Sequence, residues 1–309
     1  MARILICTPA LEGCLAPLAG HELLTGDPGS DARAQAMICD PTQTIDSDVL
    51  ARMAGLRLIA VAGAGCDRVE QPAAERAGIA VLTAGEALVE STADLAFALI
   101  LSASRLMHEA ESLLRRGEWE GWRFIERQFG RDVHGARLGL VGYGAIGRAV
   151  ARRAAGFGMH VAHHTRHPTG EPGWTRDLDR LLGASEIVSV HVPLSDSTRG
   201  LIDARRIALL PRSGVLVNTA RGPVIDEDAL AQALTDGHLL AAGLDVYGGE
   251  PRVSPRLLAA PRTVLLPHIG SATLQTRRAM LLGAAGKVAA WLADHRPPAA
   301  GIRQTPSNP

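Results

Sequence analysis

Short apolar runs alternate with helical patterns over residues 1 to about 90. The apolar runs expected to form buried strands are Ile4–Cys7, Ala36–Ile38, Arg57–Val61 and Ile79–Leu82, and helical patterns lie between them at Ser47–Met53 and Gln71–Ala77. Strands that alternate with helices favour parallel βα units. The turn Ala62–Asp67 follows a strand, and loops at the carboxyl ends of strands are where open α/β sheets bind ligands.

A long helical pattern, Ser91–Arg116, comes next. Its apolar stripe consists of Ala93, Ala96, Leu99, Ile100, Ala103, Leu106 and Met107. Asp94 near the start and Arg115-Arg116 at the end suit the helix dipole. The polar connection Gly117–Gly135 carries Trp119 and Trp122. These tryptophans either cover an interface or pack under the loop, and the pattern leaves both open.

Strand and helix patterns alternate again from Arg137 onward. The expected strands are Leu138–Val141, His160–His163, Ile187–His191, Val215–Asn218, Ala242–Val246 and Val264–Leu266. Six strands with a glycine-rich turn after the first are typical of a doubly wound dinucleotide-binding domain. A final helical pattern covers Ala272–Ala293, and we expect the tail from Pro297 to Pro309 to be loose.

The glycine-rich turn reads Gly142-Tyr143-Gly144-Ala145-Ile146-Gly147 and joins an apolar strand to a helix. Gly142 is expected to make the tight turn, and Gly144 to let a pyrophosphate approach the backbone. Gly147 would allow the helix and the strand to pack closely. The helix N-terminus then offers free N–H groups to phosphates. Strand, turn and helix together predict dinucleotide binding.

Composition excludes several classes of function. The 309 residues are enough for two domains, and 32 basic residues balance 32 acidic ones. Without a basic run, and with 3% aromatic residues, the chain gives no case for nucleic acid or for an anionic membrane as a partner. Lys287 is the only lysine. P-loop chemistry is therefore excluded, and Schiff-base catalysis is disfavoured.

The cysteines and the N-terminus indicate the compartment. Cys7, Cys14, Cys39 and Cys66 form no metal-ligand spacing, so we expect buried free thiols in a reducing compartment and no metal site. Residues 1–7 are too short for a signal sequence and predict a first strand. No apolar stretch is expected to approach the ~20 residues that span a bilayer. The sequence therefore predicts a soluble, cytoplasmic protein.

Four more segments follow predicted strands: Val190–Leu194, Asn218–Gly222, Asp245–Pro251 and Leu266–Thr273. Together with the glycine-rich turn and Ala62–Asp67, they resemble the D-isomer-specific 2-hydroxyacid dehydrogenase family over nearly the whole chain. Ser91–Ala98 and Gly156–Met159 are most similar to its glyoxylate/hydroxypyruvate/2-ketogluconate reductase branch.

The resemblance implies an α/β fold with two doubly wound parallel-sheet domains. A flavodoxin-like substrate domain would comprise residues 1–92 and 274–309, and a Rossmann dinucleotide-binding domain residues 93–273. The resemblance also implies a homodimer, formed through the Ser91–Arg116 helix and the segment with Trp119 and Trp122.

The implied activity is reduction of a small 2-keto acid by a nicotinamide cofactor. His268 would be the general acid, since the ordinary pKa of histidine, about 6.5, lies near working pH. Glu250 would orient the His268 ring, and Arg221 would grip the substrate carboxylate and polarise the ketone. Backbone N–H groups of Ala64 and Gly65 would also receive the carboxylate.

Each catalytic residue has a structural alternative. His268 could cap a turn, Glu250 could be a solvated loop charge, and Arg221 could pair with Asp226 or Glu227.

The resemblance also assigns residues to the cofactor. The set comprises the glycine-rich turn (Gly142, Gly144, Ala145, Ile146 and Gly147), His164, Thr165, Arg166, Val192, Pro193, Thr219, Ala220, Asp245 and Gly270. NAD enzymes carry an acidic residue about 20 positions after the glycines, whereas here Arg166 stands in that segment and Glu171 comes only later. We therefore expect NADP(H) to be preferred, with Arg166 on the 2′-phosphate.

Two other functions fit the same pattern. Some co-repressors that sense nicotinamide nucleotides share the fold, and relatives of the family oxidise phosphite or formate. The phosphite enzymes carry a Lys where Ala64-Gly65 stands, and the formate enzymes carry Gln in place of Glu250. Both differences favour the keto acid reductase. The side chain of the keto acid is left open by the sequence.

Overall fold

The computed structural model describes residues 1–122 and 129–294 and divides the chain into two compact units. Unit 1 is Met1–Val89 with Ser271–Pro309, and unit 2 is Glu90–Gly270. The chain passes from unit 1 to unit 2 after Val89 and returns after Gly270, in both cases a few residues before the predicted domain limits. At these crossings Ser91 Oγ donates a hydrogen bond of 2.9 Å to the Gly270 carbonyl, so both segments belong to the body of unit 2.

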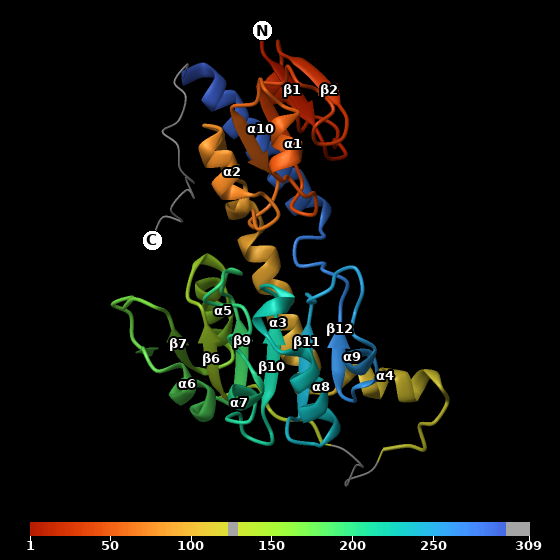
Figure 1. The fold of residues 1–309 in the computed structure, drawn as a ribbon. Helices are drawn as coiled ribbons and strands as arrows, with labels where there is room; N and C mark the ends of the chain where they lie inside the picture. The colour runs from red at the N-terminus through yellow and green to blue at the C-terminus, as the bar shows by residue number, and fades with distance from the viewer. Residues whose placement is uncertain (123–128, 295–309) are drawn as a thin grey trace. The chain divides into compact units, whose positions relative to one another are not determined.

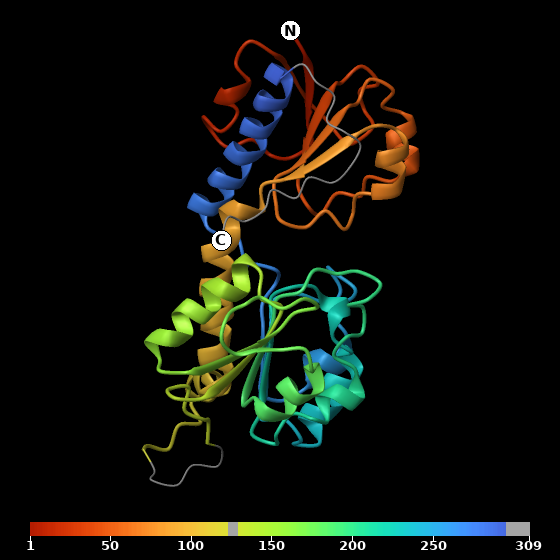
Figure 2. The same ribbon diagram turned by 90° about the vertical axis from the view of Figure 1, so that its left-hand side faces the viewer.

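Unit 1 is a five-stranded parallel sheet with helices on both faces (Figures 1 and 2). Its strand order is β2-β1-β3-β4-β5, the flavodoxin-like order. The strands are β1 (Arg3–Ile6), β2 (Glu22–Thr25), β3 (Ala36–Cys39), β4 (Leu58–Val61) and β5 (Ala80–Thr83). The helices are α1 (Ser47–Ala51), α2 (Gln71–Arg76) and α10 (Leu274–Asp294), with short turns η1 (Ala16–Leu18) and η2 (Gly85–Leu88).

Alternate residues of the unit 1 strands face two separate cores. Leu5, Met37 and Ile59 pack with α1 and α2, whereas Ile4 and Ile38 pack with α10. The predicted strands all form. The sequence analysis missed β2, an edge strand whose residues are at most half-buried and therefore lack an apolar run.

Unit 2 is a seven-stranded parallel sheet of order β12-β11-β10-β9-β6-β7-β8. The strands are β6 (Arg137–Val141), β7 (His160–His164), β8 (Trp174–Thr175), β9 (Ile187–Val190), β10 (Val215–Asn218), β11 (Ala241–Leu244) and β12 (Thr263–Leu265). The central reversal beside β6 is the Rossmann arrangement, so the predicted fold class is confirmed for both units. The prediction of six strands missed β8, which is too short to show a period.

Helices cover both faces of the unit 2 sheet (Figure 2). They are α3 (Val89–Ser104), α4 (Met107–Arg115), α5 (Ala145–Gly156), α6 (Leu178–Ala184), α7 (Ala204–Ile207), α8 (Glu227–Thr235) and α9 (Pro255–Ala259), with the turn η3 (Gly222–Val224). The single helix predicted over Ser91–Arg116 is wrong. Leu106 is buried but takes a left-handed conformation with φ 51°, which ends the first helix, and α4 begins at the next residue.

The start of this region also corrects the expectation about apolar stretches. Among the described residues, the 20-residue stretch Gly85–Ser104 is long and apolar enough to cross a membrane, with a mean hydropathy of 1.4 over its 18-residue window. Half of that stretch is buried inside the protein. The burial of Ala96, Leu99 and Ile100 against the unit 2 sheet accounts for its apolar character.

The tryptophans and cysteines can now be placed. Trp119 and Trp122 are 63% and 79% exposed, which does not support packing beneath a loop. All four cysteines are free, and burial raises the pKa of Cys7 to about 12, as expected for an inert thiol. The rest of the connection, residues 123–128, and the tail from Pro297 lie outside the described residues.

Candidate active site

The three predicted catalytic residues follow three neighbouring strands of unit 2. Arg221 comes after β10, Glu250 after β11 and His268 after β12, and these strands lie side by side in parallel. Their carboxyl ends therefore share one edge of the sheet. The close approach of Gly222 to the Tyr247–Gly248 backbone leaves no room for a Cβ and holds the loop of Arg221 against the loop of Glu250.

Glu250 and His268 form a hydrogen-bonded pair, with 2.8 Å between Glu250 Oε2 and His268 Nδ1. The second carboxylate oxygen of Glu250 accepts a bond of 2.8 Å from the Tyr247 N–H. Burial alone would raise the pKa of Glu250, but the bonds from His268 and Tyr247 and the charge of Arg221 outweigh it, so its pKa lies below the usual range. A carboxylate at Oε2 requires a proton on Nδ1 and leaves Nε2 of His268 for other chemistry. Glu250 is therefore not merely a solvated loop charge.

The loop that carries His268 is clamped by a buried carboxylate. Asp245, which is 1% exposed, accepts bonds of 2.7 Å from Ile269 N–H and 2.8 Å from Gly270 N–H. His268 itself has φ 55°, a strained conformation for a non-glycine residue, and such strain persists only where the surroundings hold it. Asp245 supplies that support directly after His268.

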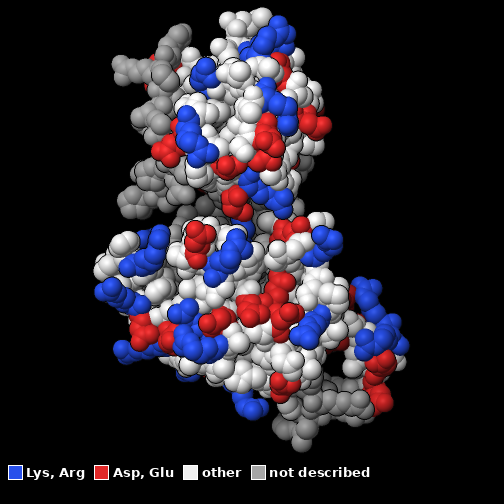
Figure 3. Space-filling view, in the orientation of Figure 1, with Lys and Arg blue, Asp and Glu red and all other residues white. Residues whose placement is uncertain are grey.

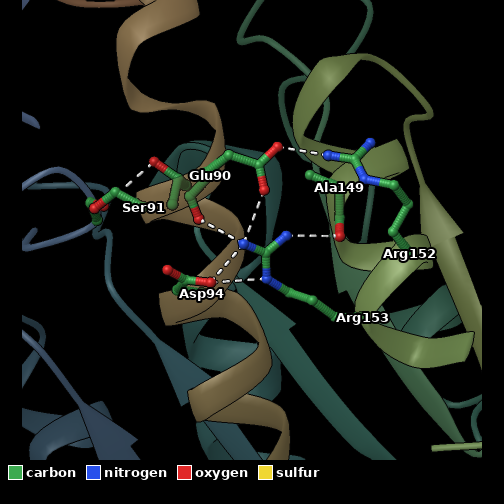
Figure 4. A network of polar contacts seen from close by, with 8 residues as sticks. Glu90, Ser91, Asp94, Ala149, Arg152 and Arg153 are labelled. Carbon is green, nitrogen blue, oxygen red and sulfur yellow. Dashed lines mark hydrogen bonds and ion pairs between the residues drawn. The ribbon is translucent and has the colours of Figure 1, made fainter. Parts of the chain in front are cut away.

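The start of α3 is fixed to helix α5 close to this loop (Figure 4). Arg153 donates to Asp94 at 2.5 Å and pairs with Glu90 at 2.9 Å, and Arg152 reaches the same Glu90 at 2.5 Å. Ser91, in the same turn, holds the Gly270 carbonyl. The backbone of Gly270 is thus held on both sides, at its N–H by Asp245 and at its carbonyl by Ser91 of α3.

Asn218 shapes the loop of Arg221. Its side-chain amide donates 2.9 Å to the Arg221 carbonyl, and its side-chain oxygen accepts 3.0 Å from the Ala220 N–H. The two acidic residues named in the structural alternative also have backbone partners of their own. Asp226 caps α8, and Glu227 accepts from Gly248 N–H at 2.5 Å.

The glycine-rich turn has the geometry that a dinucleotide requires. Gly142 has φ 99°, and a Cβ there would lie 2.6 Å from the His191 carbonyl oxygen. A Cβ on Gly147 would lie 2.5 Å from the Gly142 carbonyl oxygen. By contrast, Gly144 faces open space and is the N-cap of α5, and no side chain caps that helix. The first N–H groups of α5 are therefore available to phosphates, with Ala145 and Ile146 in its first turn.

The segment after β7 lacks a carboxylate for a ribose 2′-hydroxyl. Arg166 is exposed, and its side chain forms no hydrogen bond or ion pair with any residue that the structure describes. The Thr165 hydroxyl already donates 2.6 Å to the His167 carbonyl, and His164 Nδ1 lies 3.2 Å from the Thr175 carbonyl. Glu171 forms an ion pair with Arg148 of α5. Of the three residues in this segment that were assigned to the cofactor, only Arg166 has its whole side chain available.

The remaining predicted cofactor residues follow the strands of unit 2. Val192 and Pro193 come after β9, and Thr219 and Ala220 come after β10. The Thr219 hydroxyl is buried and has no partner among the described residues, as expected of a group that a ligand completes. The last two predicted cofactor residues, Asp245 and Gly270, differ from Thr219, because the Gly270 N–H donates a hydrogen bond to the Asp245 carboxylate.

The predicted carboxylate-binding turn lies in unit 1, after β4. The N–H groups of Ala64 and Gly65 donate to no acceptor in the described part of the chain, and both residues reach solvent. The turn begins at the carboxyl end of the interior strand β4, and its N–H groups are available to an acceptor.

Sequence reasoning missed the residues that hold the catalytic ones. Asn218 and Tyr247 orient loops through hydrogen bonds, and the Tyr247 hydroxyl donates 2.9 Å to the Leu266 carbonyl. In the sequence, Asn218 and Tyr247 are distinguished only by their position after predicted strands, within two of the segments that carry the family resemblance.

The surface charge and the possible metal ligands can also be described. On the face shown in Figure 3, basic and acidic side chains are interspersed over each unit rather than gathered by sign. Within residues 1–122 and 129–294, no group of His, Cys, Asp and Glu could hold a metal ion.

Comparison with known proteins identifies the family. The model of the D-isomer specific 2-hydroxyacid dehydrogenase NAD-binding domain matches residues 97–270. A glyoxylate reductase of Thermococcus kodakarensis is 40% identical over 253 residues, 79% of this chain and 76% of that one. A glyoxylate/hydroxypyruvate reductase B of Erwinia tasmaniensis is 40% identical over 80% and 79% of the two chains.

Solved structures agree with these relatives. The NADPH-dependent glyoxylate/hydroxypyruvate reductase of Sinorhizobium meliloti, in complex with citrate, superposes with a TM-score of 0.85 at 32% identity, covering 95% of each chain. These similarities fit the dehydrogenase prediction, not the co-repressor, phosphite or formate alternatives. The chain therefore belongs to the D-isomer-specific 2-hydroxyacid dehydrogenase family, oxidoreductases that interconvert 2-keto acids and 2-hydroxy acids with a nicotinamide cofactor.

Proposed function

We propose that this protein is an NADPH-preferring reductase of small 2-keto acids of the glyoxylate, hydroxypyruvate or 2-ketogluconate type. The observation that carries the proposal is the His268–Glu250 pair, which lies at one sheet edge with Arg221. The named substrates of the relatives from Thermococcus kodakarensis and Erwinia tasmaniensis support the substrate type.

The reaction needs a proton at the carbonyl oxygen and an electron pair at the carbonyl carbon. When bound, the reduced nicotinamide supplies the electron pair and hydrogen for the carbon. His268 donates the proton from Nε2, because its Nδ1 is held by Glu250. The same bond to Glu250 fixes the orientation of the ring during the transfer.

Two groups would bind the substrate carboxylate. Arg221 offers a planar fork that matches a carboxylate and polarises the neighbouring ketone. The N–H groups of Ala64 and Gly65 have the free donors that a second carboxylate oxygen requires. The clamp of Asp245 on the Ile269–Gly270 backbone keeps His268 in place while the proton moves.

For the cofactor, we propose that Arg166 binds the 2′-phosphate of NADPH. A charge-assisted contact of this kind contributes about 1.5–3 kcal/mol, a factor of roughly 10–100 in affinity. Replacing Arg166 by Ala should weaken NADPH by that order and leave NADH almost unchanged. Kd for both cofactors is measured at one salt concentration, with the exposed Arg176→Ala as a matched control. Tighter binding of NADH than NADPH by the wild type would overturn the preference.

We further propose a cytoplasmic homodimer. The exposed apolar side chains of α4 and the connection after it, Met107, Leu114, Trp119, Trp122 and Phe129, are 49–79% exposed, more than an isolated monomer usually gathers in one segment. Light scattering at micromolar concentration tests this, and a monomer would contradict it.

The activity itself is tested by mixing the protein with NADPH and glyoxylate or hydroxypyruvate and following the absorbance of the reduced cofactor. Oxidation of the cofactor that depends on the keto acid is expected. Cofactor binding without any turnover of the keto acid panel would instead favour a binding protein.

A further inference from the structure

The connection between β7 and β8, residues 165–173, is a closed loop in unit 2 that carries Arg166. Its two ends are held side by side, because His163 and Trp174 are register partners of β7 and β8. Glu171 is the only acidic residue of this loop. The residue proposed to bind the 2′-phosphate and a carboxylate therefore belong to the same short loop.

A carboxylate in this loop works against a phosphate ligand. The 2′-phosphate carries close to two negative charges, and a free carboxylate nearby would repel it or would pair with Arg166 in its place. Glu171 is instead paired with Arg148 of helix α5. The charge of the only carboxylate in the loop is thus balanced from outside the loop.

Arg148 is held by the glycine-rich turn. Its guanidinium carbon lies 4.8 Å from the centre of the Tyr143 ring, within the range of a cation–π interaction. The Tyr143 ring stacks on His163, with 3.7 Å between the ring centres and 15° between the planes. The His163 side chain is fully buried, and burial, followed by the charge of Arg148, lowers its pKa, so the ring is neutral at pH 7. A neutral ring behind Tyr143 leaves the positive charge of Arg148 for Glu171.

The loop is anchored to the same buried histidine. His163 Nε2 lies 2.8 Å from Thr169 Oγ1, and that oxygen accepts a bond of 3.2 Å from the Glu171 N–H. Glu171 is therefore held at its backbone by Thr169 and at its side chain by Arg148. The Arg166 side chain, by contrast, forms no hydrogen bond or ion pair within the described part of the chain. The contacts hold the carboxylate of the loop and leave its arginine available.

We propose that Arg148 determines the cofactor specificity by holding Glu171 in an ion pair, which keeps the loop able to receive the 2′-phosphate. The proposal rests on the proposed function, in which Arg166 binds that phosphate. Arg148 acts through Glu171 and is a positioning residue. Without Arg148, the freed carboxylate competes with the phosphate, whereas NADH, which has no 2′-phosphate, is bound as before.

The test measures Kd for NADPH and for NADH, at one low salt concentration, in the wild type, Arg148→Met, Glu171→Gln and the double variant. Arg148→Met should lower the preference for NADPH over NADH by about 5-fold or more, because a unit charge close to a doubly charged phosphate has an effect of this size even in water. The double variant should restore the preference to within about twofold of the wild type, because it removes the carboxylate as well. Glu171→Gln alone should not lower the preference.

Arg152→Met is the matched control. It removes the same charge from the same helix, but Arg152 pairs with Glu90 of α3 and not with the loop, so the preference should equal that of the wild type. The side chains of Arg148 and Glu171 are 39% and 40% exposed, and an ion pair this exposed contributes little to folding stability. A variant that damaged the fold or the N-terminus of α5 would weaken both cofactors together and leave the preference unchanged.

Two outcomes would overturn the proposal. An unchanged preference in Arg148→Met would show that the ion pair has no effect on the phosphate. A preference that falls in Arg148→Met and stays low in the double variant would show that Arg148 binds the phosphate itself.

Arg166→Ala, measured alongside, tests the proposed function separately. If only Arg166→Ala loses the preference, Arg166 binds the phosphate and the role of the ion pair is wrong. If Arg148→Met loses the preference and the double variant regains it while Arg166→Ala keeps it, the role of the ion pair is supported and the assignment of Arg166 is wrong.

Discussion

The strand ends of the two units differ in how their polar groups are used. In unit 2, Asp245, Asn218 and Glu250 each bind backbone or side-chain partners with both of their polar atoms. In unit 1, the N–H groups of Ala64 and Gly65 bind no residue in the described part of the chain. Groups that are already satisfied hold a fixed geometry, whereas unsatisfied groups await a ligand.

This difference matches two separate requirements of one reaction, proton transfer and substrate recognition. Proton transfer depends on distances that must not vary, and the loop of His268 is accordingly held by Asp245 and by Ser91 at the start of α3. Recognition of a carboxylate needs donors that lose only water when the substrate arrives. We therefore expect substitutions of the satisfied groups that hold the unit 2 loops, such as Asp245, to affect rate and stability, and substitutions at the unsatisfied groups to affect binding.

The strongest challenge to this comparison is the removal of His268. His268→Ala should lower kcat by roughly 10²–10⁴-fold, the usual loss for a general acid, with cofactor binding nearly intact. Stopped-flow measurement of the chemical step with saturating NADPH checks it. A rate within threefold of the wild type would show that the pair with Glu250 is structural.

A smaller effect is expected from Arg221→Lys. The positive charge remains, but the bidentate geometry is lost, so KM should rise and kcat fall together, by about 10–100-fold in kcat/KM. Steady-state kinetics with glyoxylate measure both constants. If only the melting temperature changes, Arg221 acts as a structural residue and the substrate carboxylate is bound elsewhere.

The contribution of strand-end carboxylates to thermal stability can be compared by replacing one in each unit, Asp245 in unit 2 and Asp40 in unit 1. Asp245→Asn replaces one acceptor by a donor that faces a backbone N–H, and a buried group left unsatisfied costs about 1–3 kcal/mol. Asp40→Asn keeps the oxygen that binds Thr42, in a half-buried position. Calorimetry should therefore show a fall of about 2–4 °C per kcal/mol for Asp245→Asn only. If the two variants lowered the melting temperature equally, the two carboxylates would contribute equally to stability, and the proposed difference between the units would be wrong.

Much of the architecture was readable from the sequence because buried parallel strands are continuous apolar runs. All ten predicted strands form, and β2 and β8 were missed because edge strands are short or only half-buried. The break at Leu106 was not readable, because Leu106 continues the apolar stripe and only its backbone turns.

The candidate site was predicted from a family resemblance and from position after strands, not from hydrophobic periodicity. Arg221, Glu250 and His268 were singled out by resemblance and by their place after strands, and strand order brings their loops to one edge. The partners of Asp245, by contrast, lie more than twenty residues further along the chain and follow no local pattern. The ion pair of Arg148 with Glu171 could not be predicted either, since it joins α5 to the loop after β7 and no local pattern relates the two residues.

The smallest expected effect concerns an ion-paired carboxylate that stabilises the fold but lies away from the strand ends. Asp179 of α6 accepts bonds of 2.7 Å from Arg205 and 2.9 Å from Arg206, and these bonds lower its pKa from 3.8 to about 2. Because the pKa is lowered on folding, the stabilisation is present above pH 4 and is lost as the pH falls from there towards 2.

The side chain of Asp179 is 40% exposed, so solvent screening limits the gain to about 0.2–1 kcal/mol. Asp179→Asn should therefore lower the urea midpoint slightly at pH 7 and by less at pH 3, with kcat unchanged, because the ion pair lies at helix ends away from the loops of Arg221, Glu250 and His268. Asp196→Asn, an exposed loop residue of the same unit, serves as the control and should shift the midpoint at neither pH. An equal loss for Asp179→Asn at both pH values would mean that shape rather than charge matters at this position.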